Sequence, residues 1–116
     1  MYARFGLFIA GEWRASAAST TAPVFSPVTE QSMGECPVAS TADTEAALAA
    51  AAKGFKAWAA TPAFERADAL HRIADEMLRR TDEAARMIST ETGKPIAQSQ
   101  REWGLSIDQF RWYAEE

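Results

Sequence analysis

The chain has 116 residues, enough for one compact domain and too few for two. Hydrophobic residues make up 47% and charged residues 24%, which is typical of a globular chain and not of a disordered one. A net charge of −4 gives no basic surface for nucleic acid or acidic lipid, and a single cysteine excludes an internal disulfide framework. The sequence has no apolar run long enough for a signal peptide or a membrane span, so we expect a cytoplasmic protein that binds neither nucleic acid nor membranes.

Residues 1–39 predict short β-ribbons. In chain order we expect a hairpin over residues 5–14, a loop over 15–22, an extended segment over 23–27, a turn over 28–31 and a strand over 32–38. Prolines at positions 23, 27 and 37 cannot donate ladder hydrogen bonds, so these strands are predicted at an edge or in a ribbon laid on another surface. A ribbon of this size needs a partner surface for stability.

Residues 40–116 predict helices. Helices are expected over residues 41–60, 62–80, 82–92 and 95–116. Ser40 and Asp43 have the spacing of a capping box at the first of them, and Gly93 is the predicted left-handed end of the third. The fold class is therefore α+β and mostly helical, with the ribbon segment 1–39 and the helical segment 40–116 together forming one incomplete domain.

Apolar residues recur at helical spacing in three of these helices and predict their packing faces. The predicted faces are Leu48, Ala51, Ala52, Phe55 and Trp58 in the first helix, Ala67, Leu70, Ala74, Met77 and Leu78 in the second, and Ile96, Gln100, Trp103, Ile107, Phe110 and Ala114 in the fourth. Alanines make the first helix thin, which allows a neighbour to approach closely. The fourth pattern continues to Glu116 without a stop signal, so we expect a chain cut from a longer one.

The chain's reactive residue types do not form a complete active site. Cys36 follows Glu35, whose carboxylate disfavours a reactive thiolate, so a partly buried structural cysteine is expected. His71, the only histidine, has Asp75 one helical turn later, and we expect a solvated surface pair rather than a catalytic base or a metal site. The six glycines form no phosphate-binding loop. No catalytic or cofactor-binding residue is therefore expected in this chain.

The order of short motifs nevertheless resembles a known family. The motifs are Phe8-Ile9-Ala10-Gly11-Glu12-Trp13, Phe25-Ser26-Pro27-Val28-Thr29-Glu30, Val38-Ala39-Ser40, Gly54-Phe55-Lys56-Ala57-Trp58, Thr61-Pro62 with Glu65-Arg66, Glu91-Thr92-Gly93-Lys94-Pro95 and Trp112-Tyr113-Ala114-Glu115-Glu116. In this order they resemble the N-terminal segment of the NAD(P)-dependent aldehyde dehydrogenases. Among the subfamilies, the motif sequences are most similar to those of the succinate-semialdehyde dehydrogenases. Two departures lie in the turn at the second motif: Ser26 stands where asparagine is usual, and Gln31, directly after the motif, stands where glycine is usual.

The resemblance implies a parent enzyme that oxidises an aldehyde to a carboxylic acid with NAD or NADP and forms a homo-oligomer. It places the catalytic cysteine, the general base and the dinucleotide-binding core in the remainder of the parent chain, so Cys36 is not the catalytic thiol. It also implies a monovalent-cation site formed by Glu91 with the backbone carbonyl of Val24 or Phe25. The alternative is a free-standing helical module that self-associates or binds a partner without catalysis.

Overall fold

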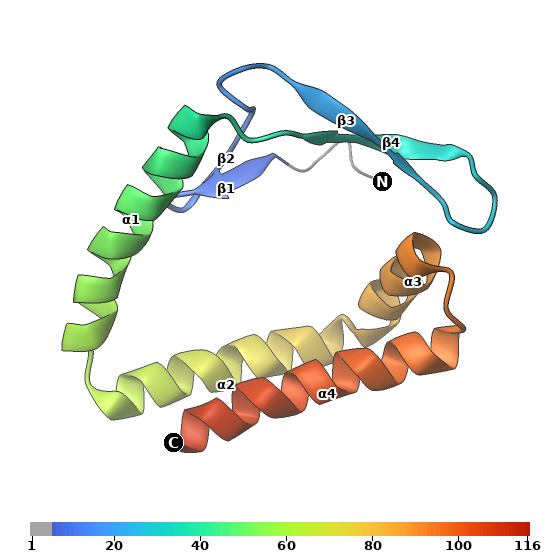
Figure 1. Ribbon diagram of the computed structural model, residues 1–116. Helices are drawn as coiled ribbons and strands as arrows, with labels where there is room; N and C mark the ends of the chain where they lie inside the picture. The colour runs from blue at the N-terminus through green and yellow to red at the C-terminus, as the bar shows by residue number, and fades with distance from the viewer. Residues whose placement is uncertain (1–5) are drawn as a thin grey trace. The chain divides into compact units, whose positions relative to one another are not determined.

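The computed structural model describes residues 6–116, and it shows two small antiparallel sheets followed by four helices (Figure 1). The strands are β1 (Leu7–Ile9), β2 (Glu12–Arg14), β3 (Thr21–Phe25) and β4 (Ser32–Pro37). The helices are α1 (Thr41–Ala60), α2 (Ala63–Arg79), α3 (Thr81–Thr92) and α4 (Ile96–Glu115). The α+β, mostly helical class is confirmed. Phe5, where the first hairpin was predicted to begin, lies outside the described residues.

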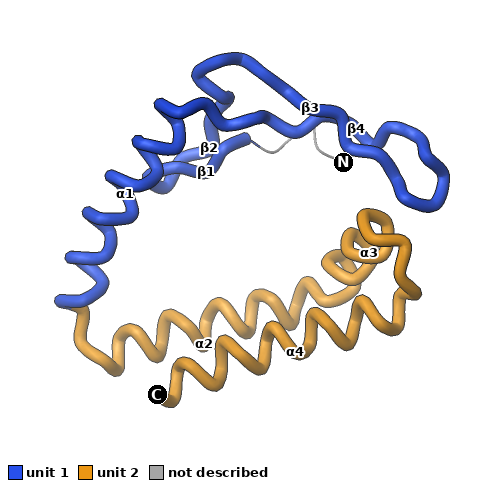
Figure 2. The backbone as a smooth tube through the Cα atoms, viewed as in Figure 1, with its two compact units in different colours: residues 1–60 blue, residues 61–116 orange. Residues whose placement is uncertain are grey.

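The chain divides by its internal contacts into two units, residues 1–60 and 61–116 (Figure 2). The first unit contains both sheets and α1, because α1 contacts β1. The second contains α2, α3 and α4. The boundary between the predicted ribbon segment 1–39 and helical segment 40–116 therefore lies inside the first unit.

The β1–β2 hairpin closes through two left-handed residues. Ile9 pairs with Glu12, so only Ala10 and Gly11 form the loop, with φ values of 57° and 87°. Two positive φ angles at these positions define the type I′ turn, whose twist matches that of the paired strands. Glu12 already belongs to β2, because the turn needs only two residues.

The β3–β4 ribbon begins at Thr21, inside the segment predicted as a loop, and its register shifts between Val24 and Phe25. In the turn that follows, Ser26 donates its N–H to the Gln31 carbonyl at 2.9 Å, and the Ser26 carbonyl accepts from the Glu30 N–H at 2.8 Å. The left-handed residue is Glu30, with φ of 59°. The position that favours glycine is therefore Glu30, and the assignment of that role to Gln31 was wrong.

Ser26 supplies the side-chain acceptor of the same turn. Its Oγ accepts from the N–H groups of Val28 and Thr29 at 3.3 Å each. A serine hydroxyl forms this local turn as an asparagine side chain does, though more weakly. The departure from asparagine therefore preserves the contact.

The packing face of α1 is not the one that the sequence predicts. Leu48, Phe55 and Trp58 are 66%, 71% and 45% exposed, and Ala51 and Ala52 are also exposed. After Asp43, the half-buried residues of α1 are the small Ala46, Ala47 and Ala50 on the opposite side of the helix. Periodicity located the apolar face correctly, but it does not specify what covers that face.

In the second unit, α4 packs against both α2 and α3. The predicted face of α2 is confirmed at Ala67, Leu70, Ala74 and Met77, whereas Leu78 is exposed. That of α4 is confirmed at Trp103, Ile107, Phe110 and Ala114. Its first turn differs, because Ile96 and Gln100 are exposed and the small Ser99 is fully buried instead.

Candidate functional site

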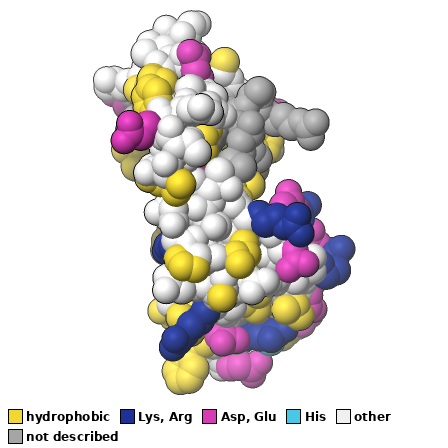
Figure 3. Space-filling view, turned by 90° about the vertical axis from the view of Figure 1, so that its right-hand side faces the viewer, with side chains coloured by type: hydrophobic (Ala, Val, Ile, Leu, Met, Phe, Trp, Pro, Cys, Tyr) yellow, Lys and Arg dark blue, Asp and Glu magenta, His cyan; other side chains and the backbone are white. Residues whose placement is uncertain are grey.

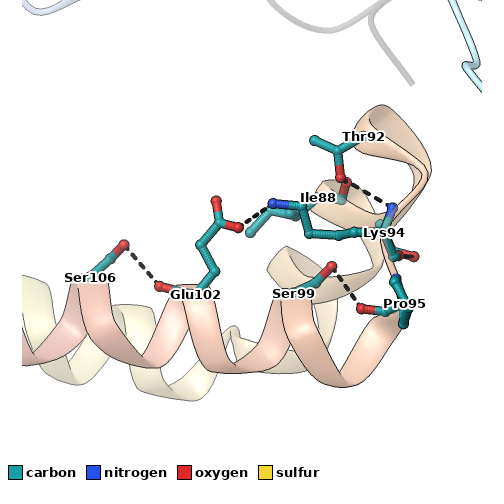
Figure 4. Close-up of polar contacts among 8 residues, drawn as sticks. Ile88, Thr92, Lys94, Pro95, Ser99, Glu102 and Ser106 are labelled. Atoms are coloured by element: carbon teal, nitrogen blue, oxygen red, sulfur yellow. Dashed lines mark hydrogen bonds and ion pairs between the residues drawn. The ribbon is translucent and has the colours of Figure 1, made fainter.

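The connection between α3 and α4 carries the most distinctive motif, Glu91-Thr92-Gly93-Lys94-Pro95 (Figure 4). Gly93 ends α3 in the left-handed conformation, with φ of 72°, and donates its N–H to the Ser89 carbonyl at 2.9 Å. This is the predicted glycine cap, and it lets the chain reverse direction within two residues. Pro95 then precedes the first residue of α4, where its missing N–H costs no helical hydrogen bond.

Side chains on both helices fix this connection. Ser89 Oγ donates to the Lys94 carbonyl at 2.7 Å, and Thr92 Oγ1 donates to the Ile88 carbonyl at 2.7 Å. The Lys94 ammonium extends along α4 and forms an ion pair with Glu102, as Figure 4 shows. Lys94 is therefore held by a carboxylate of its own unit, a contact that the sequence analysis missed.

The residues of the predicted cation site lie in different units. Val24 is half-buried and Phe25 exposed at the bulge in β3, whereas Glu91 is exposed near the end of α3. A bulge interrupts the regular ladder, which suits a strand that offers a carbonyl to a ligand. A carboxylate and carbonyl oxygens are also the ligand types that a hard monovalent cation prefers. The donor types fit such an ion, and the site stays a prediction.

The most strongly perturbed acid is Asp43, whose side chain is buried at the start of α1. Its Oδ2 accepts from Ser40 N at 2.9 Å and Ser40 Oγ at 2.7 Å, and Asp43 N donates in return to Ser40 Oγ at 3.2 Å. The capping box is thus confirmed. Asp43 also accepts from Ser16 Oγ at 3.1 Å and from Ala17 N at 3.0 Å, two partners that the sequence analysis missed.

These hydrogen bonds determine the charge of Asp43. They lower its pKa from 3.8 to about 2. The hydrogen bonds from the backbone and side chain of Ser40 are the main causes, and those from Ala17 and Ser16 act in the same direction. Burial acts in the opposite direction and raises the pKa. A carboxylate whose acceptor sites are filled by four protein donors is held as an anion. Asp43 is therefore suited to fix the loop at residues 16–17 and not to exchange protons in catalysis.

His71 and Cys36 differ from their predicted environments. His71 Nε2 lies 3.0 Å from Glu115 Oε1, whereas Asp75 lies 3.6 Å from Arg111, so the surface location was right and the partner wrong. Glu115 reaches His71 because α4 packs alongside α2, a tertiary contact that spacing within one helix cannot reveal. Cys36 is exposed, not partly buried, since it lies in a ribbon of only two strands.

Two further features of the described residues concern ligands: the direction of their strands and the spacing of their metal-ligating side chains. A dinucleotide requires a glycine-rich turn between a parallel strand and a helix, whereas both sheets described here are antiparallel pairs. Among residues 6–116 there is no group of three or more His, Cys, Asp and Glu side chains that could hold a metal ion. None of the described helices is long and apolar enough to cross a membrane.

Charged side chains gather on the helices of the second unit, as Figure 3 shows. Glu76 is paired with both Arg79 and Arg80 on α2. Such i,i+3 and i,i+4 pairs are typical of a solvated helix face.

Comparison with known proteins identifies the family. The model of the aldehyde dehydrogenase family matches residues 13–116. A glutarate-semialdehyde dehydrogenase of Pseudomonas putida is 37% identical over 109 residues, which are 94% of this chain and 23% of that protein. The crystal structure of succinate-semialdehyde dehydrogenase from Burkholderia pseudomallei matches with a TM-score of 0.93 at 35% identity, over 97% of this chain and 23% of that one.

A crystal structure of PnpE in complex with nicotinamide adenine dinucleotide matches with a TM-score of 0.92 at 31% identity, over 97% of this chain and 23% of that one. The chain thus spans about a quarter of the length of the relatives that it matches. The motifs, the two ribbons, the four helices and these matches lead to one conclusion: the chain belongs to the aldehyde dehydrogenase family.

Proposed function

We propose that this chain is the N-terminal part of an enzyme that oxidises an aldehyde to a carboxylic acid with NAD or NADP. The observation that carries the proposal is the match of nearly the whole chain to about a quarter of its relatives. The partner of this chain is then the remainder of the parent protein, which we expect to be a cytoplasmic homo-oligomer.

The catalytic residues and the cofactor site are proposed to lie in that remainder. Within residues 6–116, the two antiparallel ribbons and the four helices supply no parallel strand with a glycine-rich turn, which a dinucleotide site requires. Asp43 is held as an anion by its hydrogen bonds, and the His71 imidazole lies against Glu115 on the surface. This chain would therefore contribute an outer layer of the cofactor-binding domain, with no turnover of its own.

The proposed substrate is a short aldehyde that carries an acidic group. The support is that two of the relatives act, by their names, on glutarate semialdehyde and succinate semialdehyde, each a carboxylic acid with an aldehyde at the other end. The residues that would bind such a group are expected in the remainder of the parent.

The test is NAD(P) reduction by the purified 116-residue chain, with succinate and glutarate semialdehydes as substrates. We expect no aldehyde-dependent signal with either cofactor. Turnover that persists after further purification and is lost in Cys36→Ser would overturn the assignment of catalysis to the remainder of the parent.

We further propose that Glu91 and the carbonyl of Val24 or Phe25 bind a monovalent cation. The support is the donor chemistry and the bulge between Val24 and Phe25. The expected result is a higher melting temperature in sodium or potassium chloride than in choline chloride at equal ionic strength, with the difference lost in Glu91→Gln. An equal response of both proteins would contradict the site.

A further inference from the structure

The side chain of Lys94 is close in sequence to Glu91, the carboxylate of the candidate cation site. Lys94 is the basic residue nearest to Glu91, three positions after it, and the left-handed Gly93 turns the chain between the two. A lysine ammonium is a compact monovalent charge with three hydrogen-bond donors on a flexible stem. It can therefore take the place of a monovalent metal ion beside a carboxylate. The position of the Lys94 ammonium thus determines whether it competes for Glu91.

The structure holds this ammonium on α4. Lys94 Nζ forms an ion pair with Glu102, in the second turn of that helix, and Figure 4 shows the Lys94 side chain extended toward it. The backbone of Lys94 is fixed as well, because its carbonyl accepts from Ser89 Oγ at 2.7 Å. Both the main chain and the charge of Lys94 are therefore attached to helices of the second unit.

Loss of the Glu102 carboxylate would release the ammonium but leave its attachment to the chain in place. The pair is exposed, and an exposed ion pair is weak and exchanges readily, so the ammonium finds a new partner once Glu102 is removed. A group on a short flexible tether has an effective concentration on the order of millimolar at sites within its reach. The released Lys94 ammonium therefore competes with dissolved sodium or potassium for the carboxylate oxygens of Glu91.

We propose that Glu102 is a positioning residue of the cation site, which holds the Lys94 ammonium on α4 and thereby reserves Glu91 for a monovalent metal cation. The inference rests on the cation site proposed above, and it adds a mechanism that excludes an ammonium of the chain itself. Loss of Glu102 is expected to weaken cation binding although Glu102 is not a ligand of the cation.

Cross-linking with a carbodiimide tests the position of the Lys94 ammonium, because this reagent joins an amine and a carboxylate in contact by an amide bond. Trypsin does not cleave before Pro95, so Glu91 and Lys94 remain in one peptide, residues 87–101, and Glu102 begins the next, residues 102–111. Glu91 is the only acidic side chain of the first peptide. In the wild type we expect the two peptides to be joined. In Glu102→Gln we expect several-fold more of a cross-link internal to residues 87–101.

Thermal unfolding tests the effect on the cation. The measured quantity is the rise in melting temperature in sodium or potassium chloride relative to choline chloride at equal ionic strength. In Glu102→Gln this rise is expected to fall to less than half, and to need a several-fold higher concentration of the metal ion. The double variant Glu102→Gln with Lys94→Gln lacks the competing ammonium and is expected to recover the wild-type rise. Asp108→Asn, an exposed acid of the same helix, is the control and should respond like the wild type.

The double variant separates positioning from a structural role of the ion pair. If the pair only stabilises the connection between α3 and α4, the double variant also lacks it and responds as weakly as Glu102→Gln, which would overturn the inference. A wild-type rise in Glu102→Gln, or no increase in the cross-link between Glu91 and Lys94, would also overturn it while the cation site remains. A wild type that does not distinguish sodium or potassium from choline would contradict the cation site itself, and the inference with it.

Discussion

Ser16 Oγ donates a hydrogen bond of 3.1 Å to Asp43 Oδ2, across 27 positions of sequence. This bond and the one from Ala17 tie the loop after the first hairpin to the start of α1. The same carboxylate caps α1 through Ser40. The buried Asp43 carboxylate thus connects the loop at residues 16–17 with the start of α1.

The stability of the chain is expected to decrease at acid pH because of Asp43. Its pKa is lowered in the folded state, so the folded form binds fewer protons than the unfolded form between the two values, 3.8 and about 2. The stabilisation is fully present above pH 3.8 and is lost as the pH falls through about 2. Urea unfolding of the wild type and Asp43→Asn, monitored by circular dichroism, measures this difference.

The stabilities of wild type and Asp43→Asn should differ most near neutral pH and converge in acid. Asp68→Asn, an exposed aspartate of α2, is the matched control and should follow the wild type. A gap between wild type and Asp43→Asn that is the same at every pH would contradict the role assigned to the Asp43 charge.

In the β3–β4 turn, glycine is expected to be more favourable than the native residue at position 30. Glu30 has φ of 59°, a conformation that costs a residue with a Cβ atom about 1 kcal/mol. Glu30→Gly is therefore expected to stabilise the ribbon by up to about 1 kcal/mol, and Gln31→Gly to give no gain. Hydrogen exchange of the ribbon amides measures both, and a gain at position 31 in place of position 30 would refute the turn geometry.

Two glycines are expected to respond to alanine in opposite directions. A Cβ atom on Gly6 would lie 2.4 Å from the Arg14 carbonyl oxygen, so Gly6→Ala must disturb the β1–β2 hairpin. A Cβ atom on Gly54 in α1 meets nothing within 4 Å, so Gly54→Ala is expected to stabilise the helix by about 0.5–1 kcal/mol. Thermal unfolding of the two variants measures the contrast, which equal effects would contradict.

Trp103 is expected to stabilise the second unit through its indole N–H as well as its ring. Its Nε1 donates to the Met77 carbonyl at 2.8 Å, near the end of α2. Trp103→Phe removes this donor and is expected to cost about 1 kcal/mol in unfolding free energy. Trp112→Phe is the control, because Trp112 is exposed, and it should change stability little. Equal losses in the two variants would show that the hydrogen bond contributes nothing.

The sequence predicted the local features of this fold well because local chemistry determines them. The cap at Ser40, the left-handed end at Gly93 and the helix starts after Pro62 and Pro95 each depend on residues within one turn. The failures share a different cause. The Glu115 partner of His71 and the Ser16 donor to Asp43 lie 44 and 27 positions away, and spacing along one element carries no information about them.

The exposed face of α1 also shows that a pattern within one helix does not identify its tertiary partners. Periodicity identified Leu48, Phe55 and Trp58 as an apolar face, and the face exists as predicted. The residues that pack against this face could not be predicted. Amphipathic patterning indicates that a helix face is apolar, but it does not indicate which surface packs against that face. The candidate cation site was likewise suggested by resemblance, since Val24 and Glu91 share no local pattern.

Sequencing the reading frame beyond the codon for Glu116 shows directly whether this chain is part of a longer aldehyde dehydrogenase. We expect the frame to continue for several hundred codons and to encode a cysteine in an aldehyde dehydrogenase active-site context. A stop codon directly after Glu116 would contradict the proposed parent enzyme. The chain would then be a free-standing member of the family without the catalytic part.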